Sequence, residues 1–183
     1  MTLRLRAFAA IPPSLLRPFV VRQLLRRAAD AFRVPPPPAR GVSGNEMLRA
    51  YATFSNARAE LLLRGRGDLD AVRRDLSRSA DRLGGGLRRR LGIRTASDAM
   101  IAARAVYRAL DIDLRGFPSG DVVVPRCSFS RVYAPEVCAV MSSLDAGLFA
   151  GLTRGRRLTF TQRITEGAPA CLATLGPLEG RAA

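Results

Sequence analysis

The sequence predicts an α+β fold in which N-terminal helices precede a β-β-α-β-β antiparallel sheet covered by helices. Two observations predict it. Apolar residues recur at helical spacing as far as about residue 110. Beyond that point, two stretches with the alternation of strands flank one apolar helical segment. Two hairpins joined by a helix close most simply into one antiparallel sheet, with helices covering one of its faces.

The first forty residues form a basic block, with eight arginines and a single acid, Asp30. Apolar residues repeat at helical spacing after Ser14, a plausible N-cap, and Pro35–Pro38 then stop the helix. We interpret 1–40 as a mobile, basic, amphipathic and proline-rich arm. Such a segment can dock on the core, lie on an anionic membrane or bind a partner, and the sequence leaves these alternatives open.

One α+β domain is expected over 41–176, followed by a loose tail at 177–183. Ser43 and Glu46 have the spacing of a capping box, which predicts a helix from there to about residue 63. A second helix follows Asp68 and is expected to weaken or break at Gly84–Gly86.

A third helix begins near Thr95 or Ser97 and reaches about residue 110. Pro135 suits the first turn of the helix between the two hairpins, which runs to about Ala150. The four strands are expected at 112–117, 122–127, 157–165 and 170–175.

Charge and composition narrow the class of protein. Thirty basic residues, all of them arginine, oppose 15 acids in 183 residues, which gives a net charge of +15. This balance predicts attraction to polyanions, but no nucleic-acid-binding motif accompanies it, so specific nucleic-acid binding is not expected. We find no transmembrane helix or secretory signal in the sequence, and an odd number of cysteines argues against a disulfide framework. A cytoplasmic protein is therefore expected.

All three cysteines, Cys127, Cys138 and Cys171, lie in the last third of the chain. Asp145 follows Cys138 by seven residues, which is two helical turns, so both side chains should project from one helix face. The chain contains no histidine. Any nucleophilic or metal chemistry would therefore centre on these thiols and on nearby carboxyl groups.

One stretch of the chain runs from Cys127-Ser-Phe-Ser through Tyr133-Ala-Pro-Glu-Val-Cys138, Asp145-Ala-Gly147 and Phe160-Thr-Gln-Arg-Ile-Thr-Glu-Gly167 to Cys171. This stretch resembles the C-terminal part of the L-2-amino-thiazoline-4-carboxylic acid hydrolase-like family. The layout is also similar to the small-ligand domain of the 4-vinyl reductase type. The resemblance implies a hydrolase-like or small-ligand-binding protein, acting on a cyclic isothiourea by opening a C–N or C–S bond. It implies Cys138, Asp145 and Glu166 as catalytic groups and Arg163, Cys127 and Tyr133 as substrate-binding groups.

Three further interpretations stay open. Cys127, Cys138 and Cys171 can instead be ligands of zinc or an iron–sulfur cluster in a non-enzymatic module, although no Cys-x2-Cys pair is present. They can equally be core residues, because free cysteine packs as a small apolar side chain. The third interpretation is a peripheral membrane or polyanion-binding role through residues 1–40. In addition, the open edges of an antiparallel sheet allow a homodimer.

Overall fold

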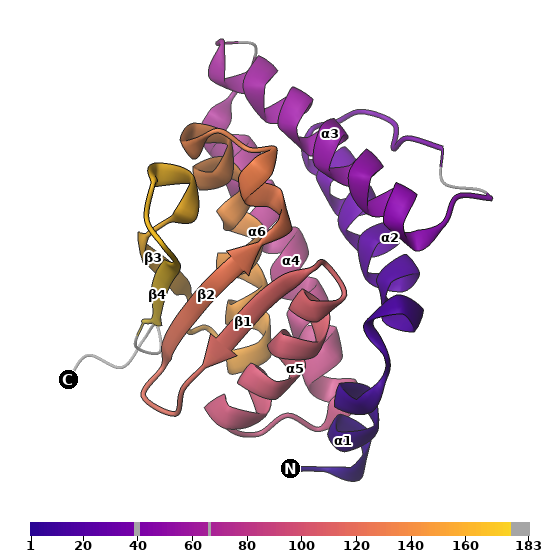
Figure 1. The fold of residues 1–183 in the computed structure, drawn as a ribbon, viewed down its shortest axis with the longest axis vertical. Coiled ribbons are helices and arrows are strands. Elements are labelled where there is room, and N and C mark those ends of the chain that lie inside the picture. The colour runs from indigo at the N-terminus through magenta and orange to yellow at the C-terminus, as the bar shows by residue number, and fades with distance from the viewer. Residues whose placement is uncertain (39–40, 66, 177–183) are drawn as a thin grey trace.

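The computed structural model describes residues 1–38, 41–65 and 67–176, so the tail expected at 177–183 lies outside the described residues. The predicted α+β class is confirmed, with the helices leading and one antiparallel sheet following (Figure 1). Its helices are α1 (Leu3–Ala10), α2 (Pro13–Ala31), α3 (Gly44–Leu63), α4 (Leu69–Leu91), α5 (Ala96–Arg108) and α6 (Pro135–Thr153). Its strands are β1 (Ile112–Gly116), β2 (Asp121–Cys127), β3 (Leu158–Gln162) and β4 (Cys171–Leu175), with short 3₁₀ turns at Ser128–Arg131 and Ile164–Glu166.

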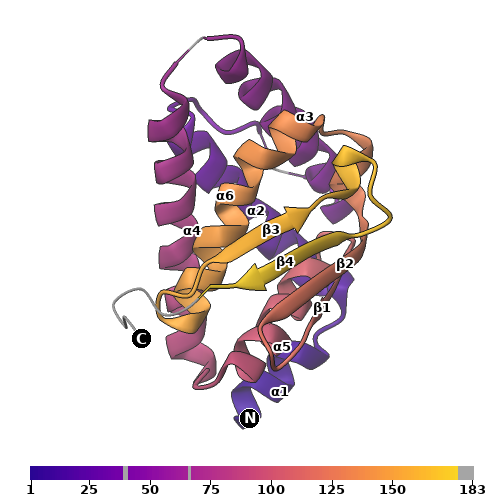
Figure 2. The ribbon, with the colours of Figure 1, turned by 90° about the vertical axis from the view of Figure 1, so that its left-hand side faces the viewer.

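The sheet has the strand order β1-β2-β4-β3, and all its pairings are antiparallel (Figure 2). The two hairpins, β1-β2 and β3-β4, join through β2 and β4, where Val122 is opposite Ala173. Strand β3 is shorter than the predicted 157–165 because the chain turns into the 3₁₀ segment after Gln162. In Figure 1 the sheet lies in front of α4, α5 and α6, with α2 and α3 along one side.

Helices α4 and α6 approach so closely that only glycine fits along their contact. A Cβ atom on Gly84 would lie 2.3 Å from the carbonyl oxygen of Leu148, and one on Gly151 would lie 2.1 Å from that of Asp81. The expectation of a break at Gly84–Gly86 is therefore wrong, because α4 continues through these residues. The glycines let the two backbones meet, and this contact fixes the position of α6.

The N-terminal segment is docked on the core and is not a separate arm. Leu5 of α1 and Val21 and Ala28 of α2 are fully buried in the main hydrophobic core. The side chain of Arg17 adds a hydrogen bond from Nε to the carbonyl oxygen of Ala109, 2.9 Å away. Helix α1 has no counterpart in the sequence-based prediction; it is capped by Thr2, whose hydroxyl accepts the amide of Leu5. Buried apolar residues on α2 explain why docking prevails over solvent exposure.

Helix α6 is, by length and composition alone, apolar enough to cross a membrane, which the sequence-based interpretation did not recognise. Within the fold, 56% of that stretch is buried inside the protein. Its apolar residues pack against α4 and β3, and Phe149 and Val140 are fully buried. Core helices of this kind share the hydropathy of membrane spans, because both are apolar on most of their circumference.

Candidate functional site

A cavity of about 120 Å³ lies between α2, α4, α5, α6 and β2. Most of its wall is made of leucine, valine and aromatic side chains. Polar groups gather on one part of the wall, where Tyr107 of α5, Asp145 of α6 and Arg163 after β3 meet the three cysteines. An apolar enclosure with a few convergent polar groups is the usual form of a small-molecule site.

Asp145 is the carboxyl group of this cavity. The hydroxyl of Tyr107 donates a hydrogen bond to its Oδ1 atom at 2.5 Å. Burial raises the pKa of Asp145 from 3.8 to about 6, although the Tyr107 hydrogen bond and the positive charge of Arg163 both lower it. Burial and the neighbouring carboxylate raise the pKa of Tyr107 well above its ordinary value, so this phenol stays protonated and remains a donor.

Arg163 brings a guanidinium group to the same wall, with 18% of its side chain exposed. The group lies over the ring of Phe160, 5.2 Å from the centroid. Its terminal nitrogens donate to Glu166 Oε1 and Ser142 Oγ, each at 3.4 Å. Its Nε atom is buried and has no hydrogen-bond partner among the described residues.

Aromatic rings make another part of the wall rigid. The ring of Tyr133 stacks on Phe129 at 5.2 Å, and Phe129 meets Tyr51 edge-on at 5.7 Å. The hydroxyl oxygens of Tyr133 and Ser55 are 2.5 Å apart, and Ser55 also donates to the carbonyl of Tyr51. Tyr133 therefore contributes its ring to the cavity, while its hydroxyl is bound to α3.

The three cysteines all line the cavity, each with its own local contacts. The sulfur of Cys171 accepts the amide of Ile164 at 3.3 Å. Burial raises the pKa of all three thiols, that of Cys127 to about 12. Metal ligands and nucleophiles are thiolates, which this environment disfavours. Over 1–38, 41–65 and 67–176, no group of three or more Cys, Asp or Glu is placed to hold a metal ion, so the zinc or iron–sulfur alternative receives no support from the geometry.

The sequence-predicted residues fall into two groups. Cys138 and Asp145 line the same cavity, as their seven-residue spacing predicts, and Arg163 and Tyr133 join them. Glu166 does not line the cavity; it is exposed in the turn after β3, where its carboxylate pairs with Arg163. The turn carries it outward, so the predicted role as an acid inside the site is not supported.

Sequence reasoning missed Tyr107 as a site residue. It lies on the buried face of α5 and is 4% exposed. Its hydroxyl partner is 38 residues away along the chain, and nothing local distinguishes it from a core tyrosine. A tyrosine among alanine, methionine and valine on a buried helix face was the one available signal, because a buried hydroxyl requires a partner.

Comparison with protein-family models, with curated proteins and with solved structures gives no match.

Proposed function

We propose that this protein binds a small, mainly apolar molecule that carries a hydrogen-bond acceptor such as a carbonyl group. The observation that carries the proposal is the apolar cavity whose wall includes the guanidinium donor group of Arg163 beside the carboxyl group of Asp145. The apolar wall supplies affinity by removing ligand surface from water. The donor supplies orientation, since a ligand without an acceptor leaves it unsatisfied.

The size of the cavity sets the class of ligand. An engineered apolar cavity of about 150 Å³ binds benzene. At about 120 Å³, this cavity is comparable and suits a single ring or a short branched chain without rearrangement. The Asp145 carboxylate adds an acceptor close to the Arg163 donor, so a primary amide matches both groups with its oxygen and its nitrogen.

The test is calorimetric titration with benzamide and toluene, which share a ring and differ in the polar group. We expect benzamide to bind more tightly than toluene, and Arg163→Met to reduce this preference about tenfold, as the loss of one hydrogen bond to a charged group requires. Arg126→Met, an exposed arginine of β2, is the matched control and should leave both affinities unchanged. Equal binding of the two probes to the unmodified protein would refute the role of Arg163.

A cavity-filling variant tests the place of binding independently. Val20 of α2 is 5% exposed and lines the cavity. Val20→Phe should weaken binding of both probes while the circular-dichroism spectrum stays that of a folded protein. Retained affinity in a folded Val20→Phe protein would place the ligand elsewhere and contradict the proposal.

Ring-opening hydrolysis is a second candidate, favoured by Asp145. A carboxyl group with a pKa of about 6 inside a cavity is suited to proton transfer near neutral pH. Because the thiols are protonated, the nucleophile would be water. Its oxygen bonds to the C=N carbon as the π bond opens, and Asp145 passes one water proton to the ring nitrogen. The remaining hydroxyl proton then moves through Asp145 to the same nitrogen, as the C–N single bond breaks and the C=O bond forms. NMR of L-2-amino-thiazoline-4-carboxylate with the protein tests this. Turnover that rises through pH 6 and is abolished by Asp145→Asn would support it, and an unchanged spectrum would exclude it.

A further inference from the structure

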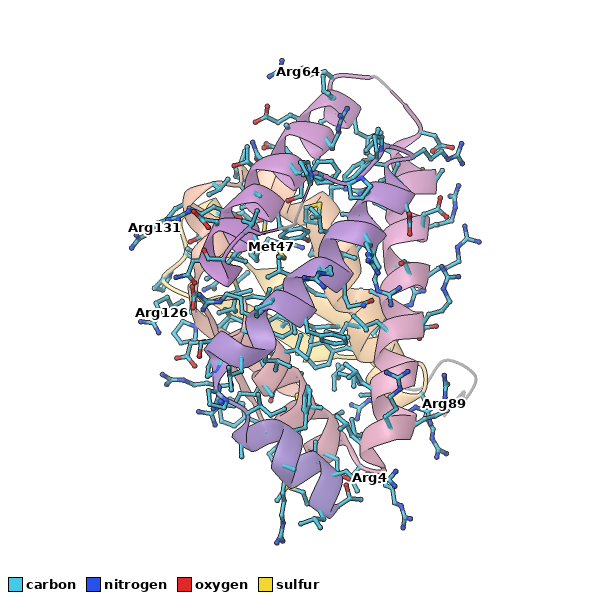
Figure 3. All side chains as sticks on the ribbon, turned by 90° about the vertical axis from the view of Figure 1, so that its right-hand side faces the viewer. Arg4, Met47, Arg64, Arg89, Arg126 and Arg131 are labelled. Atoms are coloured by element: carbon cyan, nitrogen blue, oxygen red, sulfur yellow. The ribbon has the colours of Figure 1, made fainter. Side chains whose placement is uncertain are left out.

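We propose that the outer face of α1 and α2 docks on an anionic phospholipid bilayer, and that the cavity exchanges its ligand with that bilayer. The second half rests on the proposed ligand-binding function, whereas the docking itself does not. Figure 3 looks onto this face, with Arg4 marked near α1.

The first observation is a concentration of exposed apolar side chains. Among the described residues, eight large apolar side chains are exposed, and four of them, Met1, Leu3, Leu15 and Phe19, fall within the first nineteen residues. Leu3 is 81% exposed and Leu15 72%, although both helices already bury another face in the core. Helix folding does not require these outer leucines. Single exposed leucines are ordinary, but α1 and α2 together carry three exposed apolar side chains, with Met1 just before α1, and we call these four residues the apolar patch.

The second observation is the charge around that patch. Residues 1–34 contain seven arginines and a single acid, Asp30. Arg4, Arg6, Arg22 and Arg26 are all exposed beside the apolar side chains. Apolar side chains with flanking arginines are the pattern of helices that lie in the plane of an anionic bilayer, since the apolar groups enter the interface and the cations meet phosphate. This complementarity is what selects a bilayer over an uncharged protein surface.

The third observation connects the patch to the cavity. Phe19 is 50% exposed and also lines the cavity, together with the half-buried Phe8 of α1 and Gln23 of α2. Leu83 and Leu87 of α4 complete this end and are also half-buried. The cavity therefore reaches the surface where the apolar patch is, and a bilayer covering α1 and α2 would face its mouth. A ligand delivered this way is a lipid-soluble carbonyl compound.

The experiment is co-sedimentation of the full-length protein with phosphatidylcholine–phosphatidylserine vesicles. Leu3→Ser/Leu15→Ser should reduce the partition coefficient between vesicles and solution by at least about tenfold. Arg22→Gln/Arg26→Gln should reduce it about 30-fold, as two arginines near an anionic surface require. The matched control, Arg126→Gln/Arg131→Gln, removes the same charge from exposed positions on β2 and the following turn, and should bind nearly as the unmodified protein does.

Several outcomes would overturn the docking proposal. Equal losses in the matched control and the α2 arginine variant would show that only net charge matters. A concentration-dependent dimer that Leu3→Ser/Leu15→Ser dissociates would assign the patch to a second copy of the chain. Neither leucine lines the cavity, so benzamide binding should survive in that variant. Vesicle binding without benzamide binding refutes the ligand proposal alone, and benzamide binding without vesicle binding refutes the docking alone.

Discussion

Substituting glycine by alanine at two positions in the α4–α6 pair should have opposite effects on stability. Gly86 of α4 has open space around the position of a Cβ atom. Gly86→Ala should therefore raise the free energy of unfolding by about 0.5–1 kcal/mol, since alanine loses less backbone entropy in a helix. Gly151 of α6 has the same helical backbone, but its Cβ would lie 2.1 Å from the oxygen of Asp81 and 2.5 Å from the amide nitrogen of Gly85.

Both obstacles at Gly151 are backbone atoms, so no side chain can rotate away and the helices must separate. Overpacking of this kind costs about 1–3 kcal/mol or more. Because the backbones also meet at Gly147, where a Cβ atom would lie 2.0 Å from the carbonyl oxygen of Ser77, we expect the upper part of that range to outweigh the gain in helix propensity. Gly151→Ala should lower the free energy of unfolding by roughly 2 kcal/mol, and so lower Tm by about 4–8 °C. Gly86→Ala should raise Tm by about 1–4 °C.

Urea and thermal unfolding followed by circular dichroism would measure both differences. Equal Tm values for Gly86→Ala and Gly151→Ala would refute the reasoning, because the two substitutions share every property except the space around the new methyl group. A Gly151→Ala protein that does not fold would agree with the sign, and Gly151→Ala made in the more stable Gly86→Ala protein, measured against Gly86→Ala alone, would then supply the magnitude.

Three further outcomes follow from the cavity. Burial raises the pKa of Asp145 in the folded protein, so between about pH 4 and 6 the folded state keeps a proton that the unfolded chain releases. Ionised Asp145 therefore lowers the free energy of unfolding by up to about 3 kcal/mol at pH 7 and by almost nothing below pH 4. In urea titrations, Asp145→Asn should be more stable than the unmodified protein at pH 7 and equally stable at pH 4. A stability advantage independent of pH would contradict this. Tyr133→Phe removes the hydrogen bond with Ser55 and should lower the free energy of unfolding by about 0.5–1.5 kcal/mol. The loss should fall near the low end of this range because Ser55 keeps its hydrogen bond to the carbonyl oxygen of Tyr51, and a loss above about 3 kcal/mol would contradict this account. The three cysteines should react with a chromogenic disulfide reagent at pH 7 more than about tenfold slower in the folded protein than in the urea-unfolded protein, because burial raises the pKa of each thiol. Rapid labelling of any one of them in the folded protein would show that its thiol is not buried in neutral form.

The sequence by itself determined the α+β class and the order of most elements. Local signals were sufficient for this: the Ser43 and Glu46 capping box starts α3, Asp68 caps α4, and alternating residues form β1 to β4. The spacing of Cys138 and Asp145 also placed both on the cavity side of α6, because a helix has a fixed period.

Only the tertiary structure decided what the ambiguous segments do. Gly84–Gly86 has the composition of a break, yet α4 continues through it, because the absence of a side chain at Gly84 lets α4 pack directly on the backbone of α6. Residues 1–34 have the charge of a free arm, but the apolar face of α2 is buried in the core. The pairing of Tyr107 with Asp145 joins residues 38 apart, and the outward turn of Glu166 depends on where β3 ends. Such contacts depend on distances across the fold, for which the local sequence carries no signal.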